Sequence, residues 1–161
     1  MRRDDRFFLR FPRTFQGEKV ISDLSELYTL IKRFEGCRLR PYLCPAGVWT
    51  CGWGSTGVDV IPGRSWSQEY ADRRMEADAV KFARGTLALC PSISGNDLCA
   101  IADFAYNLGL GNLKCSTLRK RINSGDSNSA YRELRKWVRG GGRILPGLVR
   151  RREAEIALMQ S

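Results

Sequence analysis

The sequence of 161 residues contains no histidine. This absence excludes Ser-His-Asp hydrolysis, Cys-His proteolysis and every metal site that uses histidine ligands. The sequence also lacks an apolar run near the roughly 20 residues that span a bilayer. Its N-terminus lacks the apolar core of roughly 7–15 residues that is typical of a secretory signal. We therefore expect no transmembrane segment, no metal and synthesis in the cytoplasm.

Acidic residues are few in comparison with basic ones. Asp and Glu number 17 against 27 Lys and Arg, which gives a formal net charge of +10. Such a charge attracts polyanions, for which an anionic bacterial envelope and nucleic acid are both candidates. No nucleic-acid-binding motif is present, so we expect no nucleic acid partner.

Composition predicts one globular domain, since 43% of the residues are hydrophobic and 27% are charged. We assign residues 1–20 to a basic N-terminal extension and residues 21–161 to the domain. Helical spacing of apolar residues between Leu24 and Phe34 predicts a first helix that ends at Gly36, with Ser22 and Asp23 as candidate caps.

The rest of the domain divides into a β-rich and a helical part. Strand-forming residues and turn glycines predict a small antiparallel sheet between about 37 and 64. A capping box at Ser65 and Gln68 predicts a helix to about Leu89. Four further helices are predicted at about 96–108, 116–123, 127–138 and 146–159. The predicted fold class is α+β, with two lobes and an active-site cleft between them.

Glu35 is the first candidate catalytic residue, because it lies in the last turn of the first helix. Phe34 and Leu39 would give it an apolar wall, which favours the neutral form of a carboxyl group. A protonated carboxyl is suited to general acid catalysis. Taken alone, a glutamate at a helix end is more often a solvated surface residue.

Five segments give this glutamate a context. They are FEGCRLRPYLCPAGVWTCGWGSTG (34–57), AYNLGLG (105–111), STL (116–118), NSGD (123–126) and GGRILPGLVRRR (141–152). In this order they resemble the phage-type lysozymes, the endolysin muramidases of glycoside hydrolase family 24. The resemblance extends over residues 24–160. It implies a lysozyme-like fold and hydrolysis of the β-1,4 bond between N-acetylmuramic acid and N-acetylglucosamine in peptidoglycan, without a cofactor.

The family's catalytic Glu, Asp and Thr correspond to Glu35, Cys44 and Thr50, so a cysteine stands where the family has aspartate. Ser55 replaces the family's histidine, which we interpret as structural. By the same resemblance, Tyr106, Asn107 and Thr117 match positions that line the sugar cleft; core packing and helix capping are the alternative roles for these three.

Three roles for Cys44 remain open. Its sulfur orients water together with Thr50 in an inverting reaction, or attacks the anomeric carbon and forms a covalent intermediate. Alternatively, the chain is a catalytically impaired protein that still binds peptidoglycan. Arg38 and Arg40 would favour a thiolate.

The spacing of the cysteines suggests a further hypothesis. Cys37, Cys44 and Cys51 follow one another at intervals of seven residues. A bridge from Cys44 to either neighbour would consume the catalytic sulfur and keep the enzyme latent until thiol exchange. Cys90 and Cys115 are candidates for a structural disulfide. The alternative is that these cysteines are buried thiols.

The resemblance also implies a biological setting. A monomeric endolysin would stay in the host cytoplasm until lysis and then act on the wall in the periplasm. The arginines at 150–152 predict a solvated helix face. One of them is able to pair with Glu35, which would favour its ionised form and oppose its role as a general acid.

Overall fold

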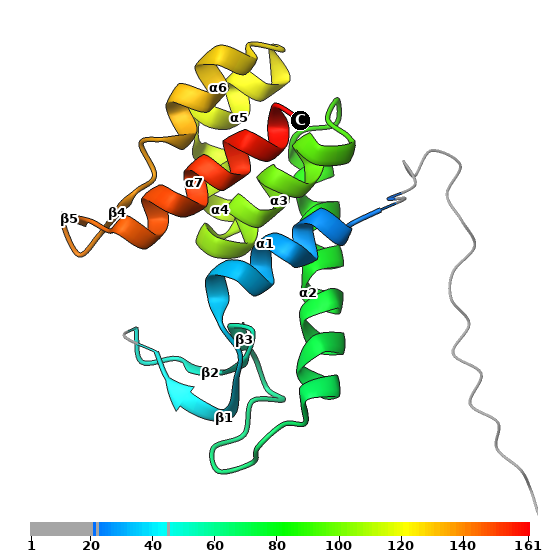
Figure 1. The fold of residues 1–161 in the computed structure, drawn as a ribbon, viewed down its shortest axis with the longest axis vertical. Coiled ribbons are helices and arrows are strands. Elements are labelled where there is room, and N and C mark those ends of the chain that lie inside the picture. The colour runs from blue at the N-terminus through cyan, green and yellow to red at the C-terminus, as the bar shows by residue number, and fades with distance from the viewer. Residues whose placement is uncertain (1–20, 22, 45) are drawn as a thin grey trace, which may run out of the picture.

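A computed structural model describes residues 21, 23–44 and 46–161. The predicted extension at 1–20 lies outside the described residues. The helices are α1 (Ser25–Glu35), α2 (Gln68–Leu89), α3 (Gly95–Leu108), α4 (Leu110–Cys115), α5 (Thr117–Asn123), α6 (Ser127–Leu134) and α7 (Pro146–Met159). The strands are β1 (Arg38–Leu43), β2 (Trp49–Gly52), β3 (Ser55–Thr56), β4 (Arg139–Gly140) and β5 (Arg143–Ile144). Figure 1 shows the long helix α2 running from the small sheet into the helical part, so the α+β prediction is confirmed.

The sheet of the β lobe has the antiparallel order β1-β2-β3. A bulge interrupts the β1–β2 register between Arg38 and Tyr42, beyond which Tyr42 pairs with Thr50. Neighbouring strand residues point to opposite faces. Cys51 therefore faces away from Thr50, into a small buried cluster with Val60, Trp66 and Ala71.

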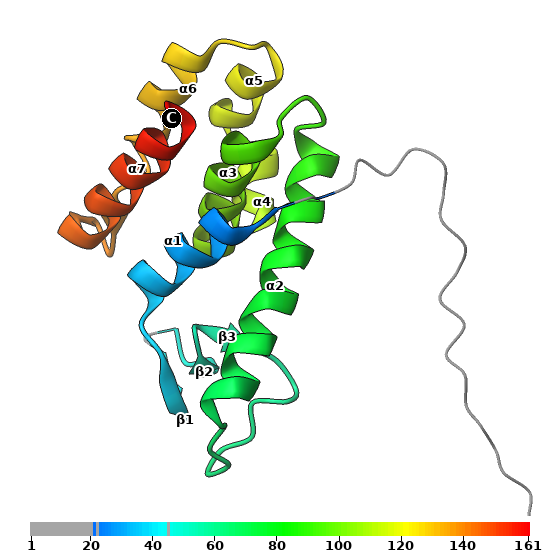
Figure 2. The ribbon, with the colours of Figure 1, turned by 45° about the vertical axis from the view of Figure 1, so that its right-hand side comes forward.

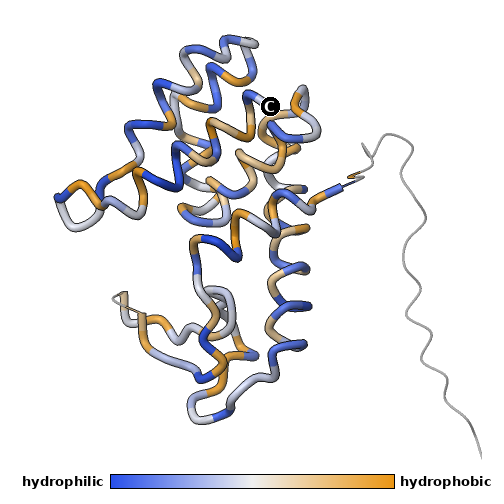
Figure 3. Tube along the Cα trace, in the orientation of Figure 1, coloured by the Kyte–Doolittle hydropathy of each residue, from blue (hydrophilic) through white to orange (hydrophobic). Residues whose placement is uncertain are grey.

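Helix α3 forms the centre of the helical lobe. It packs against α1, α2, α4 and α7, and Phe104 in its middle is fully buried. The rotated view in Figure 2 shows α3 between α7 and α2. Hydrophobic and hydrophilic residues alternate along α2 in Figure 3, as expected of a helix with one buried face. No helix among the described residues is long and apolar enough to cross a membrane.

Several predicted boundaries move. Ser67 rather than Ser65 caps α2, and its Oγ accepts a hydrogen bond of 3.1 Å from the Tyr70 N–H. The helix predicted over 127–138 ends at Leu134. Beyond it, Gly141 and Gly142 have positive φ angles and form the turn of the β4–β5 hairpin. The short helix α4 was not predicted. Asp23 does act at the start of α1, where its Oδ1 accepts from the Ser25 N–H at 2.8 Å.

All six cysteines are free thiols, so neither predicted disulfide is present. Cys90 is buried in the core, whereas Cys115 is exposed on the surface, and no bond joins their sulfurs. Cys51 points into its own cluster, where its Sγ donates to the carbonyl oxygens of Arg38 and Leu39. The sheet therefore separates Cys51 from Cys44, and the bridge that redox latency requires is absent.

Thiol reactivity tests this cysteine assignment. We expect six reactive thiols in the protein unfolded without reductant. In the folded protein, exposed Cys115 and half-buried Cys44, whose thiol pKa is lowered, react with a disulfide-exchange reagent before Cys90, because burial raises the pKa of Cys90 to about 11. A count of four or two in the unfolded, unreduced protein would contradict the assignment; mass spectrometry of the labelled peptides identifies the sites.

Candidate functional site

Glu35 is the last residue of α1 and points between the two lobes. Gly36 follows it with a φ of 63°, a conformation that glycine adopts readily and that directs the chain from the helix into β1. Glu35 Oε1 accepts a hydrogen bond of 2.6 Å from Arg151 Nη1. Gly54 lies against the other oxygen, since a Cβ placed on Gly54 would be 3.1 Å from Glu35 Oε2. Leu39 does not form the predicted apolar wall beside Glu35, because it packs against the cluster around Cys51.

Arg151 in α7 binds two carboxylates at once, Glu35 and a second one in α3. Its Nε and Nη2 each donate a 2.8 Å hydrogen bond to the fully buried Asp103 of α3. Although burial alone lowers the pKa of Arg151, Asp103 and Glu35 raise it overall, and the guanidinium stays charged. The pairing of an arginine with Glu35 is as predicted. The prediction of a solvated helix face is wrong, because both Arg151 and Arg152 are buried.

Cys44 follows β1 in the turn that leads to β2. Its N–H donates to the Val48 carbonyl at 3.0 Å, and its own carbonyl accepts from the Gly47 N–H at 2.8 Å. Hydrogen bonds from the backbone N–H groups of Val48 and Ala46, and from the Thr50 side chain, lower the pKa of the Cys44 thiol. Sequence reasoning expected arginines to do this. The hairpin turn does it instead, through N–H groups that converge on the sulfur.

Thr50 is buried in β2 and lies between Tyr42 and Thr56 in the sheet. Its Oγ1 donates a 3.0 Å hydrogen bond to the Val48 carbonyl and lies within hydrogen-bonding reach of the Cys44 sulfur. The structure therefore brings Cys44 and Thr50 together. Both stand on the hairpin that begins three residues after Glu35.

Ser55 occupies the position of the family's histidine. Its Oγ donates a 3.0 Å hydrogen bond to Asp78 Oδ2 in α2. Arg74 forms an ion pair with the same Asp78 and a 2.9 Å pair with Asp59, so a cation of α2 balances both carboxylates. The loop after β3 is thus attached to α2 without a histidine, which agrees with a structural role at this position.

The three predicted sugar-binding residues have different surroundings. Tyr106 donates its hydroxyl proton to the Trp53 carbonyl at 2.9 Å and so links α3 to the β lobe. Burial raises its pKa. Asn107 Oδ1 accepts from Arg152 Nη2 at 3.1 Å, and Thr117 is exposed at the start of α5. Their role in sugar binding stays a prediction.

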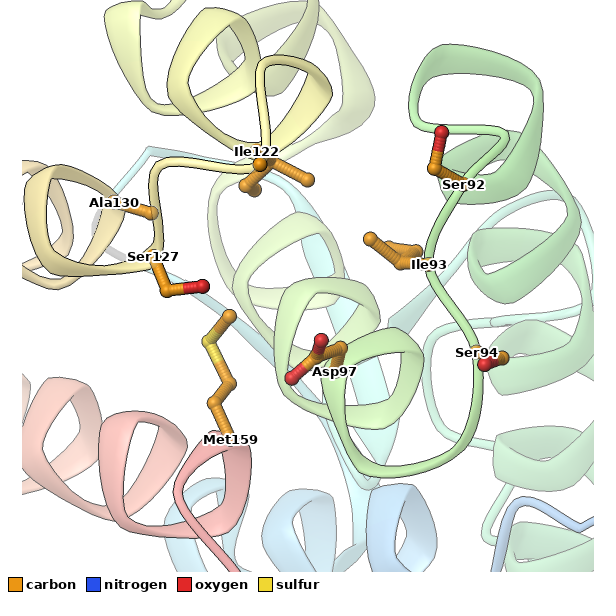
Figure 4. Close-up of a pocket in the computed structure, with 9 residues that line it drawn as sticks. Ser92, Ile93, Ser94, Asp97, Ile122, Ser127, Ala130 and Met159 are labelled. Atoms are coloured by element: carbon orange, nitrogen blue, oxygen red, sulfur yellow. The ribbon is translucent and has the colours of Figure 1, made fainter.

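A pocket of about 200 Å³ lies elsewhere, between the start of α3, the α5–α6 turn and the end of α7. Figure 4 shows Asp97 and Met159 among its lining side chains. Burial raises the pKa of Asp97. The pocket contains none of the candidate catalytic residues.

Sequence reasoning missed the charged residues beneath Glu35. They are Asp103 in α3 and Glu155 in α7, both fully buried. The only signal in the sequence is the spacing of Arg152 and Glu155 by three residues, which places them on one face of a helix. The same spacing is common on exposed helices, so it does not indicate burial.

Comparisons with known proteins fit this geometry. The phage lysozyme family model matches residues 32–155. The endolysin of Bacillus phage B103 is 39% identical over 80% of this chain, which spans half the length of that protein. The endolysin of Acyrthosiphon pisum secondary endosymbiont phage 1 is 38% identical over 82% of this chain and 93% of its own length. In structure, the muramidase domain of SpmX from Asticaccaulis excentricus gives a TM-score of 0.79 at 27% identity, with 88% of this chain and 98% of that chain covered.

Gly54→Ala tests the contact with Glu35. The φ of Gly54 is 85° and the new Cβ would press on Glu35 Oε2, so we expect a displaced carboxyl and a loss of cell-wall hydrolysis of about 10- to 100-fold. Gly63→Ala is the matched control: its φ is 79° but nothing lies within 4 Å of the added Cβ. Both variants should lose about 1 kcal/mol of stability through backbone strain. Equal activity in the two variants would show that the contact does not matter.

Proposed function

Because this chain belongs to the phage lysozyme family, we propose that it hydrolyses the β-1,4 bond between N-acetylmuramic acid and N-acetylglucosamine in peptidoglycan. The observation that carries the proposal is the setting of Glu35. This half-buried carboxyl is fixed between Arg151 and Gly54, next to a hairpin that bears Cys44 and Thr50. The substrate would occupy a cleft between the lobes.

In this proposal Glu35 is the general acid. It gives its proton to the glycosidic oxygen as the bond to the anomeric carbon breaks. Arg151 keeps its ion pair with the buried Asp103 whether or not Glu35 carries a proton. The single hydrogen bond from Arg151 orients the carboxyl, and in the product state it stabilises the carboxylate.

Cys44 takes the role of the family's aspartate. A sulfur that accepts two backbone N–H hydrogen bonds is suited to be a thiolate, which then removes a proton from a water molecule. The Thr50 side chain, placed beside the sulfur, positions that water for attack on the anomeric carbon. Because the water attacks from the face opposite the leaving oxygen, the product is inverted. Direct attack by the sulfur would instead retain the configuration.

The biological role follows from the same chemistry. Cleavage of the wall glycan would lyse the host cell, with the protein released from the cytoplasm to the periplasmic wall. The net charge of +10 would hold the protein, acting as a monomer, at the anionic envelope. A protein that binds peptidoglycan without cleaving it is the competing outcome.

Purified sacculi distinguish cleavage from binding. We expect the wild-type protein to release reducing sugar ends, and Glu35→Gln to lose about 10²- to 10⁴-fold in kcat, because glutamine has no proton of suitable acidity. Glu69→Gln, which removes an exposed carboxyl of α2, is the control and should keep full activity. Sedimentation with sacculi in the absence of sugar release would mean that the protein only binds.

Residue 44 is tested by two replacements under reducing conditions. Cys44→Ser should lose at least about 100-fold, because a serine hydroxyl does not ionise in this pH range. Cys44→Asp should stay active, with the acid limb of its pH profile at lower pH, since the ordinary pKa of aspartate is 3.8 and that of the thiol is 9.0 before the hairpin lowers it. Serine equal to wild type would remove sulfur from the mechanism. The anomer released by wild type decides between water and sulfur attack.

A further inference from the structure

Four charged side chains lie buried beneath Glu35. They are Asp103 in α3 and Arg151, Arg152 and Glu155 in α7. Removing charged groups from water is costly unless each is paired and hydrogen-bonded. The number of protons bound by these groups should therefore be the number that gives each group a charge partner and a hydrogen bond.

Glu155 has one oxygen that finds no donor. Its Oε1 accepts a 2.6 Å hydrogen bond from Arg152 Nη2, but its buried Oε2 accepts none among the described residues. The carboxyl group of Asp103 acts on Glu155 from nearby, since its charge and a side-chain hydrogen bond with it both raise the pKa of Glu155. Asp103 has both oxygens on Arg151, and each oxygen keeps a second lone pair free. Two adjacent carboxylates would repel one another, whereas a proton between them forms a hydrogen bond.

The charge balance leads to the same answer. With every group ionised, two guanidinium groups would face three carboxylates, namely Glu35, Asp103 and Glu155. Besides Glu155, Arg152 contacts Asn107 Oδ1 and the ring of Phe104, while its buried Nε and Nη1 find no acceptor among the described residues. While Glu35 is ionised, one proton on the cluster makes these charges equal, and the fully buried Glu155 is the carboxyl with an oxygen that lacks a donor.

We propose that Glu155 is held as a neutral carboxylic acid that donates a hydrogen bond to Asp103 and thereby fixes the Asp103–Arg151–Glu35 chain. Glu155 is then a positioning residue for the reaction, a role that rests on the proposed function. The protonation of Glu155, in contrast, does not depend on the proposed function. Burial raises the pKa of Glu155 well above its ordinary value, and Asp103 adds to this while Arg152 opposes it.

The proton on Glu155 has a measurable effect on stability. A group with a raised pKa binds more protons in the folded state than in the unfolded state, so stability falls as the pH rises above the ordinary pKa of 4.5. Glu155→Gln mimics the neutral acid: its amide N–H donates to Asp103 and its oxygen accepts from Arg152. Relative to this variant, the unfolding constant of wild type should increase by up to about tenfold per pH unit above that pKa, until Glu155 ionises in the folded state.

Glu153→Gln is the matched control on the same helix. Glu153 is half-exposed and pairs with Arg135, which lowers its pKa. The control should therefore lose stability relative to wild type as the pH rises, the opposite sign from Glu155→Gln. If Glu155→Gln behaves as the control does, Glu155 is ionised and the proposal is overturned. An infrared band of a protonated carboxyl at neutral pH that vanishes in Glu155→Gln would support the proposal independently.

The positioning role is tested by comparison with Glu155→Met, which has no donor. We expect Glu155→Gln to stay within about twofold of wild-type kcat on sacculi, and Glu155→Met to lose about 10- to 100-fold in kcat with a shifted pH profile and an unchanged KM. An unshifted profile and full activity, or failure of Glu155→Met to fold at any temperature, would assign Glu155 a structural role only. Wild type without activity on sacculi would overturn the proposed function, while the stability comparison would still decide the proton on Glu155.

Discussion

The shared guanidinium of Arg151 is the interaction on which the candidate site depends. The Nε and Nη2 atoms of this group donate hydrogen bonds to Asp103, and the remaining nitrogen, Nη1, donates to Glu35. Three helices meet in this contact, since Glu35 ends α1, Asp103 lies in the centre of α3 and Arg151 lies near the start of α7. Buried charges tolerate little displacement without losing their partners. The ion chain therefore couples the position of the candidate acid to the packing of the whole helical lobe.

The second half of the site, around Cys44, is held by backbone hydrogen bonds rather than by buried ion pairs. Cys44 is held by a hairpin turn, and its sulfur is surrounded by backbone N–H groups rather than by charged side chains. The face of β2 opposite Thr50 carries Cys51 into a separate apolar cluster, which anchors the hairpin against α2. A polar site on one face thus depends on a small core on the other. This arrangement also places Cys51, with Cys37 packed against its cluster, away from Cys44, and all three remain free thiols.

Much of the fold was predictable because its signals are local. The periodicity between Leu24 and Phe34, the turn glycines of the sheet and Pro146 at the start of α7 each specify an element within a few residues. The errors occurred where local signals are ambiguous. Two serines precede α2 and only Ser67 caps it, and α6 ends at Leu134, four residues before the predicted end.

The sequence by itself determined the family, the α+β class and the candidate residues Glu35, Cys44 and Thr50, since all of these rest on residue types in a fixed order. Tertiary structure alone decided that Arg151 is buried and shared, that backbone groups lower the pKa of the Cys44 thiol, and that no disulfide forms. Glu35 and Arg151 are separated by 116 residues, and no local rule determines which charged side chains of a helix face the interior. Burial and proton count follow from what surrounds a group in space, and packing alone supplies those surroundings.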